Sequence, residues 1–183
     1  MSRDESLDLL KNNLSNENLF KHCLAVEAIM KGIASYLNEE EEMWAICGLL
    51  HDIDYERTKD DHKNHGLVAE EILKDKVSDE VMHAIKSHNF ENTGVNPESK
   101  IDFALIAADA VSGLVIASAL IQPSKKLEDV KVKSIKKKFK QKDFARNCNR
   151  ENMLLCEKLG IEKEKFFEIS LNSMKTISED LGL

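Results

Sequence analysis

Hydrophobic residues recur along most of this chain at the three- and four-residue spacing of amphipathic helices, and the alternating pattern typical of strands is nearly absent. In residues 16–37, for example, His22, Val26, Ile29 and Ile33 lie on one helical stripe. The pattern predicts helices over residues 4–14, 16–37, 40–51, 65–75, 79–88, 100–121, 126–140, 142–147, 151–159 and 162–181. The chain is therefore expected to be an all-α, single-domain helical bundle.

Capping and helix-breaking residues support these boundaries. Ser78 is suited to cap the helix that begins at residue 79, and Pro123 ends the most apolar helix of the chain. The polar stretch 51–64 and the turn-rich stretch 90–99 are predicted as loops.

Composition narrows the class of protein further. A chain of 183 residues can form one domain without disulfides or structural metals. No apolar run is long enough for a transmembrane helix, and no apolar stretch follows a basic start as in a secretory signal. The four cysteines lack CxxC spacing, and Cys23, Cys47 and Cys156 lie among apolar residues, so reduced thiols are expected. These features favour a cytoplasmic protein with no membrane partner.

Charge is unevenly distributed. The net charge of -7 disfavours nonspecific binding to nucleic acid or anionic lipid. Residues 125–146, however, hold ten Lys and Arg against three acids, which gives +7 and leaves -14 for the remainder. This basic segment has three interpretations: a solvated helix face, an electropositive wall that attracts a phosphorylated substrate, or an RNA-binding module. The last is disfavoured because no recognisable stacking motif surrounds Phe139 and Phe144.

The six histidines all lie between residues 22 and 88, and several occupy positions that should be apolar. His22 lies on an inward stripe, His51 and Asp52 end the apolar run AICGLLHD, and Asp109 lies within FALIAADAVSGLVIA. A buried Asp is costly unless it is paired or bound to a metal, and no basic residue occurs between positions 100 and 125. Two imidazoles and two carboxylates suit one divalent transition ion with open positions for water and substrate.

The order of these residues resembles the HD-domain superfamily of metal-dependent phosphohydrolases. HCLAVEAIMKGIA is similar to the first helix of that family, GLLHDID to its HD motif, ALIAADAVSGL to its last ligand helix and HGLVAEEIL to the helix that follows the motif in HDIG-type members. The chain also looks like a branch of predicted HD hydrolases in which the motif continues as HDIDYE and a basic extension follows. We therefore expect one domain over 1–183, with an HD core at about 16–122 and a basic helical C-terminal extension at about 125–183.

The resemblance implies a ligand set for one divalent ion, which would be Mn, Fe, Co, Ni or Zn. The residues that match the family's ligands are His22, His51, Asp52 and Asp109.

The other histidines have several interpretations. In some members of the superfamily, histidines between the HD pair and the last Asp bind a second metal. His65 and His88 are therefore candidates for a second ion, for phosphate contacts or for core positions. His62 is expected to be solvated in its loop, and His83 to be structural or exposed.

The expected mechanism is attack by a metal-activated water on a phosphoryl group. Asp52 would be catalytic as a ligand, and Asp54 is a candidate to orient or deprotonate the water, with loop capping as its alternative role. Glu56 is a weaker candidate for that role, and Lys63 and Lys86 are candidates for phosphate contacts.

The expected substrate is a small phosphate ester or anhydride, of a nucleotide by preference. The alternatives are a nucleoside monophosphate, a dinucleoside polyphosphate and a cyclic dinucleotide. The last is least favoured because SHNFENTGVNP has Asn89 where the enzymes for cyclic dinucleotides have a second His, and it has no Tyr. From a different functional class, the domain would be a nonhydrolytic sensor that binds a nucleotide and retains the metal site.

Overall fold

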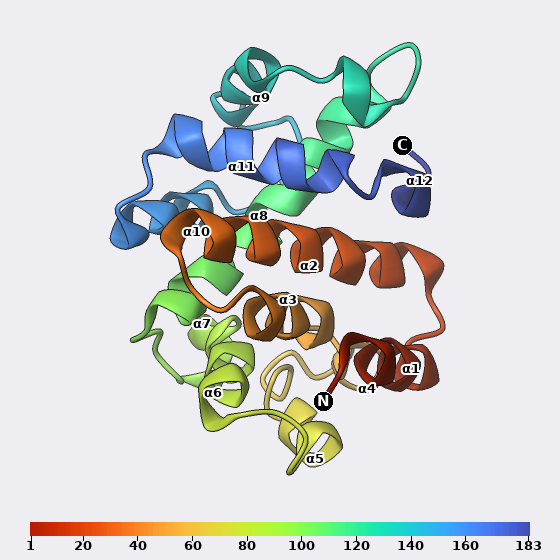
Figure 1. Cartoon of the computed structure of the whole chain (residues 1–183), viewed down its shortest axis with the longest axis vertical. Coiled ribbons are helices and arrows are strands. Elements are labelled where there is room, and N and C mark those ends of the chain that lie inside the picture. The colour runs from red at the N-terminus through yellow and green to blue at the C-terminus, as the bar shows by residue number, and fades with distance from the viewer.

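The computed structural model describes all 183 residues and contains helices but no strand, as the sequence predicted (Figure 1). Its elements are α1 (Arg3–Asn13), α2 (Glu17–Leu37), α3 (Glu41–Leu50), α4 (Tyr55–Thr58), α5 (Ala69–Leu73), α6 (Asp79–Ser87), α7 (Phe90–Thr93), α8 (Lys100–Leu120), the 3-10 helix η1 (Leu127–Asp129), α9 (Val132–Phe139), α10 (Arg150–Met153), the 3-10 helix η2 (Leu154–Leu159), α11 (Lys163–Lys175) and α12 (Ser178–Leu181).

The long helices begin and end within a residue or two of the expected positions. Side-chain caps account for several of these boundaries, because Asn16, Ser78 and Ser99 each accept hydrogen bonds from the first turn of the following helix. The predicted helix over 65–75 is shorter than expected, since Gly66 has a φ of 89° and the helix starts only at Ala69. The two predicted loops each contain a four-residue helix, α4 and α7.

The C-terminal part departs most from the predicted pattern. Residues 142–147, expected as a helix, form turns, with Ala145 in the left-handed region at a φ of 46°. The expected helix over 126–140 is a 3-10 turn followed by α9, and the one over 151–159 is largely η2. The expected helix over 162–181 divides into α11 and α12, because Ile177 leaves the helical region.

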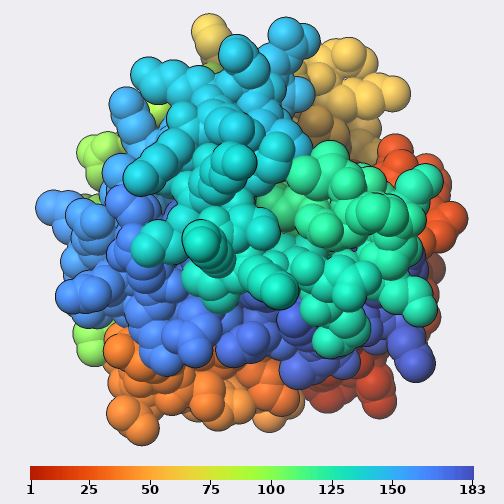
Figure 2. Space-filling view, turned by 90° about the horizontal axis from the view of Figure 1, so that it is seen from above, coloured from red at the N-terminus to blue at the C-terminus, as the bar shows by residue number.

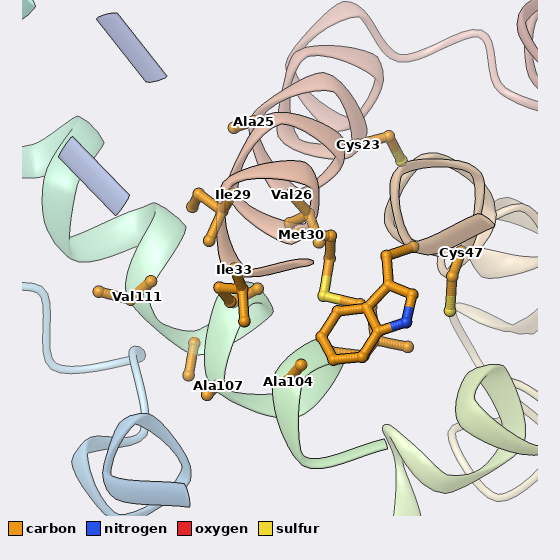
Figure 3. Packing of buried hydrophobic residues seen from close by; sticks show 14 of the residues in the cluster. Cys23, Ala25, Val26, Ile29, Met30, Ile33, Cys47, Ala104, Ala107 and Val111 are labelled. Carbon is orange, nitrogen blue, oxygen red and sulfur yellow. The ribbon is translucent and has the colours of Figure 1, made fainter. Parts of the chain in front are cut away.

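The core lies where α2, α3 and α8 meet. Figure 3 shows Ile29 and Ile33 of α2 close to Ala104, Ala107 and Val111 of α8. The small alanines allow the two helices to pack closely. A single cluster of 44 buried residues contains side chains from both ends of the chain, from Leu10 of α1 to Leu181 of α12. The C-terminal helices therefore pack on the same core as the HD motif.

The α8 helix is long and apolar enough to span a membrane by length and composition alone. Within the bundle, however, 67% of its most apolar stretch is buried against other helices. A helix that is hydrophobic on all sides is expected at the centre of a bundle. The apolar character of α8 is thus accounted for by its packing.

Gly48 fixes how closely α3 approaches α2. A Cβ atom at this position would lie 2.8 Å from the carbonyl oxygen of Val26 and 2.9 Å from Cγ of Met30. His22 lies one turn before Val26 on α2, and His51 lies one turn after Gly48. The close approach at Gly48 therefore brings these two imidazoles together.

We predict that Gly48→Ala destabilises the protein. Alanine ordinarily stabilises a helix relative to glycine by about 1 kcal/mol. Here the added methyl group meets backbone atoms and forces α2 and α3 apart, so a loss of about 1–3 kcal/mol in the free energy of unfolding is expected from urea denaturation.

Gly113→Ala is the matched control for this change, because the only atom near its added Cβ is the rotatable thiol of Cys148. An equal or smaller loss for Gly48→Ala than for Gly113→Ala would contradict the proposed role of Gly48.

Candidate metal centre

Asp52 lies at the centre of a cluster of four imidazoles. It follows His51, the C-cap of α3, in a turn that directs both side chains to one point. Its Oδ1 lies 3.1 Å from Nε2 of His65, 3.4 Å from Nε2 of His51 and 3.5 Å from Nε2 of His88. Its Oδ2 lies 3.6 Å from Nε2 of His22. One buried carboxylate thus contacts four histidines from separate parts of the chain.

The cluster consists of two triads that share Asp52, and each has the spacing of a metal site. His22 and His51 form the first with it, and their Nε2 atoms are 3.2 Å apart. His65 and His88 form the second, with Nε2 atoms 3.0 Å apart. An ion about 2.0–2.2 Å from each ligand atom separates adjacent ligands by roughly 3–3.6 Å. Both triads therefore fit a transition ion.

Asp109 adds a second carboxylate to the first triad. Its Oδ1 lies 3.1 Å from Nε2 of His22 and 3.9 Å from Nε2 of His51. The structure thus brings together His22, His51, Asp52 and Asp109, and it places His65 and His88 beside them.

Two of the imidazoles are oriented by backbone carbonyls. Nδ1 of His51 donates to the carbonyl of Gly48 at 2.8 Å, and Nδ1 of His88 donates to the carbonyl of Ile85 at 2.5 Å. A hydrogen on Nδ1 leaves the Nε2 lone pair free in the neutral ring. Both rings are therefore held in the tautomer that binds a metal through Nε2.

Side chains orient the other two imidazoles. Nδ1 of His65 donates to Oδ1 of Asp54 at 2.9 Å. Nδ1 of His22 lies 3.2 Å from the hydroxyl of Ser112, which itself donates to the carbonyl of Asp109. All four rings consequently present Nε2 to the same region around Asp52.

The structure revises the expected role of Asp54. Its side chain is fully buried, and its Oδ2 accepts hydrogen bonds from the backbone N–H of Gly66 at 2.8 Å and of Ala69 at 3.0 Å, while Oδ1 accepts from His65. Asp54 does not line the cleft, so it is not placed to deprotonate a water there. It positions His65 and caps the start of α5, which corresponds to the alternative, loop-capping role.

The carboxylates and imidazoles shift one another's pKa values in opposite directions. Burial alone disfavours the charged form of each group. For His51 burial prevails and lowers its pKa to about 4, so this ring is neutral. For His65 burial is outweighed by Asp52 and Asp54, which raise its pKa to about 10. For Asp52 the neighbouring imidazoles outweigh burial and hold its pKa well below the usual range.

The pair of His22 and Asp109 behaves in the same way. Burial lowers the pKa of His22, but hydrogen bonding to Asp109 outweighs it, so the pKa of His22 is raised. Burial raises the pKa of Asp109, and the contact with His22 outweighs it in turn, so that pKa is lowered. The contact between the two groups therefore favours the charged form of each, and His22 would have to be unprotonated at Nε2 to bind a metal ion.

An open cleft of about 470 Å³ lies over the cluster. Its lining consists of Leu19, His22, Asp52, Tyr55, His65, His88, Asn89, Phe90, Glu91, Asp109, Ala110, Ser112, Gly113, Asn147, Cys148, Asn149 and Asn152. The amides and aromatic rings among these residues were not identified from the sequence. Three asparagines within six residues were the only available signal, and no spacing linked them to the HD motif.

No lysine or arginine lines this cleft. The basic segment 125–146 spreads over the face of the molecule shown in teal and cyan in Figure 2. Within it, Lys136 pairs with Glu164 at 2.8 Å. The expected electropositive wall therefore does not form part of the cleft, and most of the basic side chains lie on a solvated face.

The other side chains that were expected to contact phosphate or water lie outside the cleft. Lys63 and Lys86 do not line the cleft, and Lys86 pairs with Glu70 at 2.6 Å. Glu56 accepts hydrogen bonds from the backbone at the start of α2, which removes it from the chemistry.

The two remaining histidines lie outside the cluster. His62 is exposed in its loop, and Nδ1 of His83 lies 3.0 Å from Asp102. These positions match the solvated and structural roles expected for them.

A helical bundle that carries an adjacent His-Asp pair, a further His on an earlier helix and an Asp on a later one has the organisation of an HD domain. The model of the HD-domain family matches residues 19–114, and the chain belongs to this family. Members of this superfamily are generally metal-dependent phosphohydrolases.

A curated relative also matches part of the chain. It is the Uncharacterized protein MJ0778 of Methanocaldococcus jannaschii, 32% identical over 114 residues. The match covers 60% of this chain and 65% of that protein, just under two thirds of its length. No solved structure matches this chain.

We predict that Asp52→Ala abolishes divalent-metal binding at both triads, whereas Asp109→Ala impairs binding at the first triad alone. Asp52 belongs to both triads, and Asp109 contacts only the first. Elemental analysis of the purified variants, with circular dichroism as the check on folding, distinguishes the two.

Asp60→Ala, which changes an exposed acid outside the cleft, is the control for these variants. Unchanged metal stoichiometry in folded Asp52→Ala would contradict the assignment of the ligands.

Metal binding is predicted to release protons. At pH 7 the metal-free His65 is protonated, because its pKa is raised to about 10, and its Nε2 must lose that proton to bind an ion. The apparent affinity for Zn²⁺ should therefore rise with pH, by about tenfold per pH unit for each proton released.

Calorimetry in two buffers with different heats of ionisation measures this proton release directly. His62→Asn should release the same number of protons as the unaltered protein. An affinity that does not change between about pH 6 and about pH 8 would show that His65 is not a ligand.

Proposed function

We propose that this protein is a cytoplasmic, metal-dependent phosphohydrolase that cleaves a phosphate ester or anhydride of a nucleotide. The observation that carries the proposal is the convergence of four Nε2 atoms on the shared carboxylate of Asp52, in the lining of an open cleft. The ligands of the first ion would be His22, His51, Asp52 and Asp109. His65 and His88 would hold a second ion with Asp52.

The ligand chemistry favours Mn, Fe, Co, Ni or Zn, because imidazole is a poor ligand for Mg²⁺ and Ca²⁺. When bound, such ions supply a water of lowered pKa and neutralise phosphoryl oxygens. The chain itself orients the ligands through the contacts on Nδ1 of each histidine. Asp54 would orient the His65 ring with or without a bound ion, because it accepts a hydrogen bond from Nδ1 and leaves Nε2 available to the ion.

A nucleotide fits the size and character of the cleft. The volume of about 470 Å³ lies within the range of small-molecule sites. Tyr55 and Phe90 offer aromatic surface for a base, and several asparagines offer hydrogen bonds.

The cytoplasmic location is supported by the cysteines. All four are free thiols, and burial raises the pKa of Cys23, Cys47 and Cys156, which keeps them protonated and unreactive. Reduced thiols of this kind are typical of a reducing compartment.

The test is a screen of nucleotides and simple phosphate esters against the purified protein loaded in turn with Mn, Fe, Co, Ni, Zn or Mg. We predict release of inorganic phosphate or nucleotide with a transition metal, and at least a hundredfold loss in Asp52→Ala, since one substitution removes ligands of both ions. Nucleotide binding without turnover under every metal would contradict the proposal and would identify a nonhydrolytic sensor.

A further inference from the structure

The C-terminal extension reaches the metal cluster through residues 147–152. Cys148 lies against Gly113 of α8, so closely that a Cβ at position 113 would fall 2.6 Å from its Sγ. Gly113 is one helical turn beyond Asp109. The segment therefore lies next to a candidate ligand, and its side chains form part of the cleft lining.

Two amides in this segment have no hydrogen-bond partner in the protein. Oδ1 of Asn149 accepts from the backbone at 2.9 and 3.2 Å and caps α10. Asn89, which lines the cleft but lies far from this segment in the sequence, donates to the backbone carbonyls of His62 and His65. Asn147 and Asn152 make no such contacts, yet both line the cleft. Each offers a donor and an acceptor to a bound molecule.

Arg150 determines the shape of this segment. Its guanidinium donates hydrogen bonds to the backbone carbonyls of Phe139, Gln141, Phe144, Ala145 and Cys148. The two contacts from Nη1 are 2.9 and 2.7 Å long. These bonds supply partners for carbonyl groups on both sides of Asn147 in a stretch that lacks helical pairing, so Arg150 helps to position Asn147.

The charge of the cleft limits the number of phosphate groups it accepts. Its lining contains three carboxylates, Asp52, Asp109 and Glu91, and no Lys or Arg. Two divalent ions would bring four positive charges, which leaves about one after the three carboxylates are neutralised. A single phosphate group, which carries about -1.5 to -2 near pH 7, would leave about one negative charge unbalanced, whereas a polyphosphate chain would leave several.

We propose that Asn147 and Asn152, positioned by Arg150, select the neutral, hydrogen-bonding nucleoside part of a substrate that carries one phosphate group. This inference rests on the proposed function and specifies its substrate as a nucleoside monophosphate. Arg150 is a positioning residue, because its donors are directed to the backbone. The extension thus contributes specificity through neutral amides.

The test compares the metal-loaded protein with Asn147→Ala, Asn152→Leu and Arg150→Lys. The probes are the four ribonucleoside 5′-monophosphates, glycerol 3-phosphate, ATP and inorganic phosphate. For the best monophosphate we expect KM to rise about tenfold in each variant, with kcat within about twofold, because one or two hydrogen bonds to substrate are lost. The Kd for inorganic phosphate and the metal content should stay unchanged. Asn172→Leu, an exposed position on α11 outside the cleft, is the control.

Calorimetry with the four nucleosides provides a readout that is independent of turnover, and the same variants should weaken the tightest of them about tenfold. Equal effects on glycerol 3-phosphate and the monophosphates, or a preference for ATP, would overturn the inference. In either case, the proposed function would still hold if the unaltered protein bound metal and inorganic phosphate. If the unaltered protein bound neither metal nor inorganic phosphate, the proposed function itself would be overturned. Circular dichroism establishes that Arg150→Lys, which keeps the charge but not the planar fork, remains folded.

Discussion

The structure depends on one buried carboxylate, that of Asp52, which is placed among four imidazoles. An isolated charge at that position would cost several kcal/mol, and removing one partner of a buried ionic pair typically costs about 3–5 kcal/mol. The cost is offset only when helices from different parts of the chain deliver their side chains to the same point. The contacts with the carboxylates outweigh burial and raise the pKa values of His22 and His65, which favours the positively charged form of both rings beside Asp52. Each ring would have to be unprotonated at Nε2 to bind an ion.

Two glycines allow the helices to come close enough for these side chains to meet. Gly48 lets α3 approach the backbone of α2, which aligns His51 with His22, and Gly113 lets the C-terminal segment approach α8 beside Asp109. A substituent at either position would change the packing a single turn away from a candidate ligand. Packing and chemistry are therefore coupled here, because the close helix approach at Gly48 lies one turn from His51.

The helices and the candidate ligands were predictable because both leave local signals. An amphipathic stripe predicted α2 and a long apolar run predicted α8, and polar residues at apolar positions of the sequence identified Asp52 and Asp109 as candidate ligands. The sequence left two roles open for Asp54, water activation and loop capping, because its partners include backbone N–H groups whose positions depend on how the chain turns at Gly66. The loop over 142–147 was mispredicted for a similar reason. Arg150 binds carbonyl oxygens there, and backbone acceptors are present at every residue whatever the sequence.

The separation of the basic segment from the histidines along the chain does not correspond to two parts of one site in the structure. The histidine-containing part and the basic segment appeared to separate metal binding from phosphate attraction, but no basic side chain lines the cleft. A cationic wall beside the cluster would compete with the metal ions for the carboxylates of Asp52 and Asp109 and would raise the electrostatic cost of binding them. Neutral amides avoid that competition while still offering directional hydrogen bonds. A cleft in which bound ions would neutralise the phosphate is thus best served by a polar, uncharged wall, and the residues of the C-terminal segment that line it, Asn147, Cys148, Asn149 and Asn152, carry no charge.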